Sequence, residues 1–384
     1  MFCVFGVINS AAVFETYFKS HQLSDHSHAQ LSWIFSLYLF TVYFVGVLVG
    51  PFFDRFGHRL LIPLGSVCIV ASPMLLSLSS EYYQIVLTFS VLSGIGGSLV
   101  NSPAYAAIGH YFDERRGLAT GIAAAAGGVG GVIFPFILRS ALASLGFAWS
   151  MRLLGFILLA LLIPPNLFLG TRMSTNDTDK SVWPDVRIFR DPKFSFCCAG
   201  IFLMEYGVLI PLTYIMSYAE AQGLDVGDSY TLPALLNAGS ILGRIIPGLV
   251  CDRMGRFNVL LITVGGCAVT VLALWLPASD TQGLLIAFVV LLGFMSGGNV
   301  SLIPVCIGQL CETQDYGRYL STAMLVAGFG TLTGIPIGGA LLALNPQVRW
   351  TALILFSGLS YVASFACYSA ARVLAVGWHP GKVF

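Results

Sequence analysis

Long apolar runs alternate with short polar turns along the whole chain. Most of the runs reach the ~20 residues that a helix needs to cross ~30 Å of hydrocarbon. Period-2 alternation is absent, which argues against a membrane barrel. The pattern therefore predicts an all-α membrane protein with twelve transmembrane helices, at residues 1–18, 31–53, 60–79, 82–109, 117–139, 150–170, 194–218, 230–251, 258–277, 282–309, 320–344 and 350–374.

The first apolar run is the shortest of the twelve and contains Asn9. Its eighteen residues would reach about 27 Å as a helix. Either it just spans the hydrocarbon, or the true start of the protein lies upstream, and the sequence leaves both open. No basic segment and no cleavage site accompany this run, so we expect no signal peptide.

Composition supports a lipid environment. The chain is 57% hydrophobic and 10% charged, whereas soluble domains carry about 25% charged residues. The net charge of +1 and the absence of basic blocks exclude a nucleic-acid footprint. Nine Cys occur without CxxC spacing, so we expect buried free thiols and neither a disulfide framework nor a metal site. We also expect no cofactor, and interpret His21, His26 and His28 as exposed loop residues.

A charged turn between two apolar runs occurs twice, 198 residues apart. The first copy is Gly50-Pro-Phe-Phe-Asp54-Arg55-Phe-Gly57, and the second is Gly248-Leu-Val-Cys-Asp252-Arg253-Met-Gly255. Further matches at an offset of 201 pair Gly96, Gly97, Pro103, Gly127 and Pro135 with Gly297, Gly298, Pro304, Gly328 and Pro336. The repeat predicts two homologous six-helix bundles related by an axis along the membrane normal, as some transporters have.

The predicted bundles are residues 1–170 and 194–374. A polar linker, 171–193, joins them, and a short tail, 375–384, follows. Of the 19 Lys and Arg residues, fourteen fall on the side that includes the linker, four fall opposite, and Arg244 lies inside a span. Because cytoplasmic loops carry the excess of Lys and Arg, both termini are expected in the cytoplasm.

The two turns are candidate gating elements. Gly57 and Gly255 permit a tight reversal. Asp54 and Asp252, with the neighbouring Arg55 and Arg253, lie at cytoplasmic helix ends. Each acid could face the positive N-terminus of a helix from the other bundle, beginning near Tyr319 and Gly117 respectively. We favour this latch over the alternative of a simple positive-inside turn, because the whole pattern is duplicated.

Three segments resemble the monocarboxylate transporter family. Tyr111-Phe-Asp-Glu-Arg-Arg-Gly117-Leu-Ala-Thr-Gly121 is similar to the family signature that opens helix 5. Asn237-Ala-Gly-Ser-Ile-Leu-Gly-Arg244 and Phe329-Gly-Thr-Leu-Thr-Gly-Ile-Pro336 resemble the fungal branch. The resemblance covers nearly the whole chain and implies the major facilitator fold, with small solutes moved by alternating access.

The sequence also departs from the family pattern. The acidic-Gly-aromatic signature before helix 1 is missing. The helix 1 lysine of proton-coupled animal members falls at Asn9, and their helix 8 aspartate falls at Ser240. Only the helix 8 arginine is kept, as Arg244. The resemblance therefore does not extend to lactate-type proton symport.

Two charged residues lie inside apolar runs, and such groups are functional candidates because lipid makes them costly. Arg244 could bind a solute carboxylate with two parallel hydrogen bonds; alternatively, it is a structural arginine paired inside the bundle. Glu205 lies near the middle of its span, where burial favours the neutral acid. It is a candidate proton carrier, or else a hydrogen-bonded structural acid.

Polar residues in the other spans are weaker candidates, because some will only join helices. The predicted solute-binding set comprises Arg244, Asn9, Asn101, Tyr105, Tyr206, Asn237 and Asn299. The glycine run of helix 5, including Gly127, permits close helix approach and fits either a sliding surface or static packing.

We therefore interpret the chain as a secondary active or facilitative transporter of a small organic solute, such as a carboxylate or a secondary metabolite. The alternative is a nutrient sensor that keeps the fold without turnover. An enzyme is not expected, because no cluster of His, Cys or carboxylate residues forms an active site. The expected partners are a small-molecule solute and the lipid bilayer, without nucleic acid. We expect a monomer in the plasma membrane.

Overall fold

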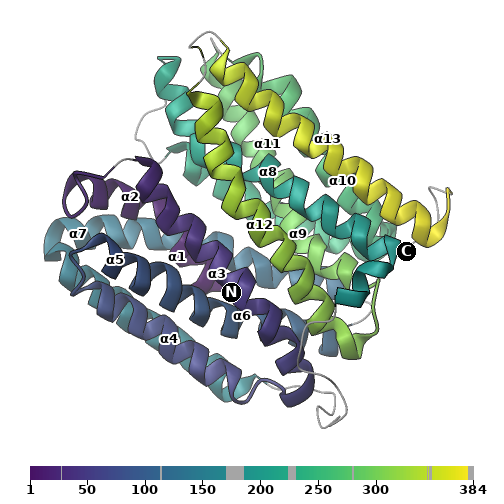
Figure 1. The fold of residues 1–384 in the computed structure, drawn as a ribbon, viewed down its shortest axis with the longest axis horizontal. Helices are drawn as coiled ribbons and strands as arrows, with labels where there is room; N and C mark the ends of the chain where they lie inside the picture. Colours follow the sequence, from purple (N-terminus) through teal and green to yellow (C-terminus); the bar gives the residue numbers. More distant parts are fainter. Residues whose placement is uncertain are drawn as a thin grey trace. The chain divides into compact units, whose positions relative to one another are not determined.

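The computed structural model describes residues 1–26, 28–112, 115–169, 186–223, 231–278, 281–343, 345 and 348–378. All regular structure in these residues is helical (Figure 1). Nine helices of the described part are long and apolar enough to cross a membrane. One of them, α7 (Arg116–Phe168), holds two of the predicted spans, so the helical prediction agrees with the structure.

The chain divides into two compact units, each built from more than one segment. Unit 1 comprises Met1–Asp113, Ala126–Asp185 and Glu312–Gly328. It holds the first part of the chain up to α6 and most of α7. Its own helices are α1 (Phe2–Asn9), α2 (Ala11–Ser20), α3 (His28–Phe56), α4 (Leu61–Leu76), α5 (Tyr82–Ile85), the π-helix η1 (Val86–Leu92) and α6 (Ser93–Tyr111).

Unit 2 comprises Glu114–Ala125, Val186–Cys311 and Phe329–Phe384. It therefore takes the first turns of α7 (Arg116–Phe168), while unit 1 takes η5 (Thr313–Asp315) and the first turns of α12 (Tyr316–Leu342). Its remaining elements are η2 (Val186–Arg190), α8 (Pro192–Ala221), α9 (Thr231–Met254), α10 (Arg256–Val269), the π-helix η3 (Thr270–Trp275), α11 (Gln282–Ile307) and α13 (Arg349–Val376).

The helices of unit 2 pack in pairs. Figure 1 shows α8 beside α13, and α9 packs along α11. Small residues permit the second pairing, because a Cβ on Gly239 would meet the backbone of α11 at Val290. The packing is completed by an aromatic cluster in which Trp275 contacts Tyr218 and stacks on Phe288, with ring centroids 5.7 and 5.1 Å away.

In unit 1, α6 packs against both α3 and α4 (Figure 1). Phe89 of η1 lies in the middle of an aromatic core, 5.2 Å from the ring of Phe14 and 5.6 Å from the ring of Phe35. Tyr38 is buried beside them, and its hydroxyl donates to the carbonyl of Val4 on α1 at 3.1 Å. This bond ties the first helix to α3.

The first predicted span is not one continuous helix. It is interrupted at Ser10, which has φ −89° and ψ 6°, between α1 and α2. The buried Ser10 hydroxyl donates to the carbonyl of Gly6 at 2.9 Å, so the side chain supplies a bond close to the interruption. The helical part also runs two residues beyond the predicted end, to Ser20.

The loop predicted between the fifth and sixth spans, at residues 140–149, is helical instead. The segment continues as α7 to Phe168, with a single non-helical residue, Gly146 (φ 71°, ψ 173°). Ala and Leu, which dominate residues 141–145, are strong helix formers, so the helix ends only where glycine permits a positive φ.

The duplicated turns adopt the predicted conformation. Gly57 follows α3 with φ 74°, and Gly255 follows α9 with φ 92°, a region that glycine enters without a steric penalty. Of the predicted linker, 171–185 lies outside the described residues. The rest contains η2 and the start of α8, where the Asp191 carboxylate accepts from the amide of Lys193 at 3.0 Å and Pro192 occupies the first turn. Residues 379–384 of the predicted tail are also outside the described part.

Candidate functional site

One face of α9 contacts the first turns of α7 within unit 2. The contacting residues, Asp252, Gly248 and Arg244, are four residues apart and so lie on one side of the helix. The Asp252 carboxylate accepts from the backbone amides of Gly117 and Leu118, at 2.9 and 3.0 Å. The contact that the repeat predicts between Asp252 and the start of a helix near Gly117 is therefore present. It satisfies two amides that a helix N-terminus leaves without intrahelical partners.

Glycines bring the two backbones together below this contact. A Cβ on Gly248 would lie 2.6 Å from the Gly117 carbonyl oxygen. A Cβ on Gly121 would meet the carbonyl oxygen of Arg244, and one on Gly117 would meet the Cys251 thiol. At these glycine positions no side chain larger than hydrogen fits, so α7 and α9 touch there through their main chains.

Arg244 continues the same contact by one further turn. The residue is 8% exposed, and its Nη1 donates to the carbonyl of Ala124 at 2.7 Å. The guanidinium therefore crosses from α9 to α7, about 12 Å from the start of α7 at 1.5 Å per residue. This bond corresponds to the structural alternative for Arg244.

Arg116 is a buried residue beside this contact that the sequence pattern did not single out. It is 3% exposed, and its Nη1 donates to the carbonyl of Gly308, directly after α11, at 3.3 Å. In the sequence it counts only as one more positive charge on the side that we predict to be cytoplasmic. Arg116, Thr120 and Ala124 fall on one helix face and all three are buried, but the same spacing places Arg115, Ala119 and Ala123 on another face, so the sequence did not identify Arg116.

The first duplicated turn makes a similar close contact in unit 1. A Cβ on Gly50 would meet the carbonyl oxygen of Gly317 and the hydroxyl of Ser321 on α12. The predicted helix start near Tyr319 is three residues late, because α12 begins at Tyr316. The side chain of Asp54 lies outside the described part. Arg55 is half-buried over the ring of Phe56, at 5.0 Å, and its counterpart Arg253 is exposed.

The turns themselves differ in charge. His58 occupies the place that Arg256 has in the second copy. Burial and the neighbouring Arg59 lower the pKa of the His58 imidazole, which favours its neutral form. The first turn thus carries one positive charge fewer than the second at this position.

Glu205 and Tyr206 face α12 within unit 2. The hydroxyl of Thr331 donates to the Glu205 carboxylate at 3.4 Å, and the hydroxyls of Tyr206 and Thr333 are 2.9 Å apart. A Cβ on Gly330 would lie 3.1 Å from the Glu205 Cβ. The glycine allows α8 and α12 to approach closely, so the short threonine side chains of α12 can reach Glu205 and Tyr206 on α8. Two hydroxyl partners that the sequence analysis missed, Thr331 and Thr333, belong to this group.

The predicted asparagines have different surroundings. Asn9 donates to the carbonyl of Gly127 on α7 at 3.2 Å, and Asn299 donates to the Cys267 sulfur at 3.4 Å. Both therefore join helices. Asn101 and Tyr105, one turn apart on α6, are buried, and Asn237 on α9 is half-buried. Asn9, Asn101 and Tyr105 belong to unit 1, whereas Arg244, Glu205, Tyr206, Asn237 and Asn299 belong to unit 2.

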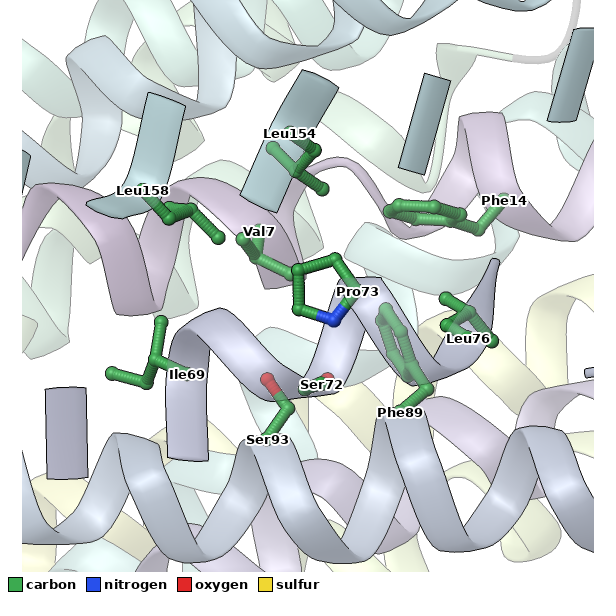
Figure 2. A pocket seen from close by; sticks show the side chains of 10 residues that line it. All are labelled: Val7, Phe14, Ile69, Ser72, Pro73, Leu76, Phe89, Ser93, Leu154 and Leu158. Carbon is green, nitrogen blue, oxygen red and sulfur yellow. The ribbon is translucent and has the colours of Figure 1, made fainter. Parts of the chain in front are cut away.

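A small pocket in unit 1 is not suited to an organic solute. Figure 2 shows it between α1, α2, α4, η1, the start of α6 and the later part of α7, with the hydroxyls of Ser72 and Ser93 among mostly apolar side chains. Its volume is about 10 Å³, which is room for roughly one water molecule. The described residues also contain no group of three or more His, Cys, Asp or Glu that could hold a metal ion.

The family follows from comparison with known proteins. The family model described as Major Facilitator Superfamily matches residues 1–311, and a second, overlapping match covers 248–380. The chain belongs to the major facilitator superfamily. The crystal structure of the E. coli fucose:proton symporter FucP is similar to this superfamily member, with a TM-score of 0.72 at 15% identity, over 96% of each chain. The predicted fold class is thereby confirmed.

Curated relatives of this superfamily member are transporters. The riboflavin transporter MCH5 of Saccharomyces cerevisiae is 36% identical, over 97% of this chain and 76% of its own length. The MFS-type transporter opdF of Penicillium oxalicum is also 36% identical, over 98% of this chain and 89% of its own. The predicted function is confirmed: the protein is a multi-pass transmembrane transporter of a small-molecule solute. Family and fold indicate a non-enzyme, and the sensor alternative gains no support.

Proposed function

We propose that the solute is a small organic anion or polar metabolite, bound at Arg244 in a transporter of the monocarboxylate-transporter-like branch. The observation that carries this proposal is the position of Arg244, a cation that is only 8% exposed within an apolar span, α9. A guanidinium cannot lose its charge at useful pH, and it has five N–H donors. A carboxylate is the partner that matches this fork with two parallel bonds.

Glu205 is the proposed coupling residue. It lies in an apolar span, and its carboxylate accepts a hydrogen bond from Thr331. This half-buried carboxyl exchanges protons more readily than the hydroxyls around it, because Tyr and Thr hydroxyls stay protonated. In this proposal Arg244 binds the solute, and Glu205 couples its transport to the movement of a proton. Asn9, Asn101, Tyr105, Tyr206, Asn237 and Asn299 supply further polar contacts to the solute.

The duplicated turns are the proposed gate. The Asp252 contact with the start of α7 links the predicted second bundle to the first, and the repeat assigns Asp54 the same role at the start of α12. Arg55 and Arg253 flank these acids. In our proposal the bundles 1–170 and 194–374 move about the linker 171–193, and the Asp contacts form on the cytoplasmic side and break during each cycle.

The relative named a riboflavin transporter broadens the set of solutes to test beyond simple monocarboxylates. We propose a monomer in the plasma membrane, without nucleic-acid partners, with both termini, including the tail 375–384, in the cytoplasm. Membrane-impermeant maleimide on intact cells tests this orientation. A cysteine at Ser24 should label from outside, and one at Arg190 should label only after permeabilisation; the reverse pattern would overturn the topology.

Flux assays with purified protein in proteoliposomes test the solute and the coupling. The solutes are pyruvate, lactate and riboflavin, each with and without an imposed pH gradient. Saturable flux of one solute identifies the class, and no saturable flux of any would reject this range of solutes. For the solute carried, Glu205→Gln should abolish accumulation driven by the pH gradient and leave exchange between the two sides. Full accumulation in this variant would remove Glu205 from the coupling role.

A further inference from the structure

The start of α7 is held by two helices at once, through side chains of opposite charge. Arg116 donates to the carbonyl of Gly308 after α11. The next two residues, Gly117 and Leu118, donate their amides to Asp252 on α9. Three consecutive residues thus bind two partners, and the end of α7 cannot shift or rotate without loss of at least one of these bonds.

The Arg116 bond is favourable for a physical reason beyond the hydrogen bond. Gly308 caps α11, and its amide returns to the Pro304 carbonyl at 3.1 Å. Helix C-termini carry a partial negative charge, because their last carbonyls lack intrahelical donors. The Arg116 cation therefore lies at a negative helix end, while the Asp252 anion lies at the positive end of α7. Each charge complements a different helix.

Burial distinguishes Arg116 from an ordinary cytoplasmic charge. Arg115 precedes it in the same turn and is exposed, whereas Arg116 is 3% exposed. The positive-inside rule, which sets the orientation of a membrane protein, requires only that both residues carry a positive charge near the membrane. It does not require one of them to be enclosed against a neighbouring helix end.

We propose that Arg116 is a positioning residue of the transport cycle, which holds the start of α7 on α11 while Asp252 holds it on α9. Removing Arg116 weakens the closed cytoplasmic gate without touching the solute. The inference rests on the proposed gating role of Asp252, but it assigns a second, cationic anchor on a different helix.

Cys251 is a native reporter for this contact. It is 1% exposed, and its sulfur lies against Gly117, since a Cβ there would meet it. Separation of α7 from α9 uncovers the thiol. Maleimide labelling of Cys251 in the full-length protein in proteoliposomes, followed by mass spectrometry of the peptide, measures how often the contact opens.

We expect Arg116→Gln to label Cys251 about two- to thirtyfold faster than the unaltered protein, the range expected for a charge at a helix end. Arg116→Lys should restore part of the protection, because an ammonium still donates to a carbonyl. Arg115→Gln is the matched control and should leave labelling unchanged. Solute affinity is measured by equilibrium binding without transport. Its fold change in Arg116→Gln should not exceed the fold change in Cys251 labelling, because Arg116 does not contact the solute.

Arg116→Met provides a second neutral variant, since an unbranched apolar side chain fills the same buried space. If Arg116→Gln does not fold, the Cys251 labelling rate of Arg116→Met tests the proposal instead. Labelling of Cys251 at the original rate in every folded neutral variant would overturn the proposal. Asp252→Asn separates the two ideas. If Asp252→Asn exposes Cys251 and neither Arg116 variant does, only the role of Arg116 fails. If Asp252→Asn also leaves Cys251 protected, the gate itself is wrong.

Discussion

The α3–α12 contact of unit 1 and the α9–α7 contact of unit 2 come from the same duplicated turn but differ in chemistry. Both bring a glycine, Gly50 or Gly248, against the carbonyl of another, Gly317 or Gly117. One turn earlier in each helix the copies diverge. Gly46 on α3 faces the Ser98 hydroxyl, with a Cβ distance of 3.4 Å, whereas Arg244 on α9 reaches α7.

The other side of the contact diverges as well. Gly117 and Gly317 are 200 residues apart, and the residue before each is Arg116 in unit 2 but the buried Tyr316 in unit 1. The duplication has kept the close backbone packing and the acid of each turn, Asp54 or Asp252. The two buried arginines, Arg244 and Arg116, belong to the α9–α7 contact alone.

Gly248→Ala should have the largest effect, because it attacks the shared packing. The new Cβ would lie 2.6 Å from the Gly117 carbonyl oxygen. Overpacking costs about 1–3 kcal/mol, or roughly five- to 150-fold in the ratio of closed to open gate. Maleimide labelling of Cys251 should accelerate accordingly, and transport should fall.

Gly50→Ala sharpens the comparison, because it should impair transport to a similar extent through α12. Gly283→Ala is the matched control, since a Cβ there has nothing within 4 Å. Normal transport by both Gly248→Ala and Gly50→Ala would show that close packing is not what the two copies share.

Arg244→Lys tests the group present in only one copy. An ammonium cannot form two parallel bonds to a carboxylate. Loss of a charged hydrogen bond costs about 1.5–3 kcal/mol, or about ten- to a hundredfold in affinity for the solute carried. Binding titrations should show this loss, while Gly46→Ala, at the matching place in α3, should bind normally. Unchanged affinity in Arg244→Lys would assign the residue to the α9–α7 contact alone.

Asp252→Asn should have a smaller effect, because the amide oxygen can still accept one hydrogen bond. A charge at a helix N-terminus contributes about 0.3–2 kcal/mol, so Cys251 labelling should rise by about two- to thirtyfold. Asp54→Asn makes the same change at the first turn, read through a cysteine placed at Ser321. An effect in one variant alone would mean that the latch, like Arg244, belongs to a single copy.

Thr331→Val should have the smallest effect. It removes one hydrogen bond of 3.4 Å to Glu205, worth about 0.5–1.5 kcal/mol. Accumulation driven by a pH gradient should fall by roughly two- to tenfold, with exchange retained. Thr333→Val breaks the neighbouring contact to Tyr206 instead and serves as the control. Equal losses in both variants would point to packing of α12 rather than to Glu205.

Much of this architecture was predictable because membrane helices follow from hydropathy and backbone hydrogen bonding. The repeat also predicted the partner of Asp252, since short turns and helix dipoles limit where an anion can lie. The interruption at Ser10 and the helical segment before Gly146 were not predictable from apolar runs, which continue through both. They depend on local backbone angles.

The partners of individual polar side chains were predicted least well. Arg116 is indistinguishable from Arg115 in a charge count, and only the burial of its helix face separates them. Thr331 and Thr333 are mildly polar residues in a glycine-rich run. The hydrogen bonds that their hydroxyls form depend on which residues of α8 they face. The pairing between helices is set by packing that one sequence does not reveal.

The two π-helical segments, η1 and η3, have a consequence for how this fold can change over time. A π turn closes its hydrogen bond over one residue more than an α turn, so each segment holds one residue beyond regular α-helical register. Loss of one residue from Val86–Leu92 or Thr270–Trp275 can be absorbed by reverting to an α turn. In the helix beyond the shortened segment, every side chain then keeps its place relative to the neighbouring helices. We therefore expect each of these segments to tolerate the deletion of one residue.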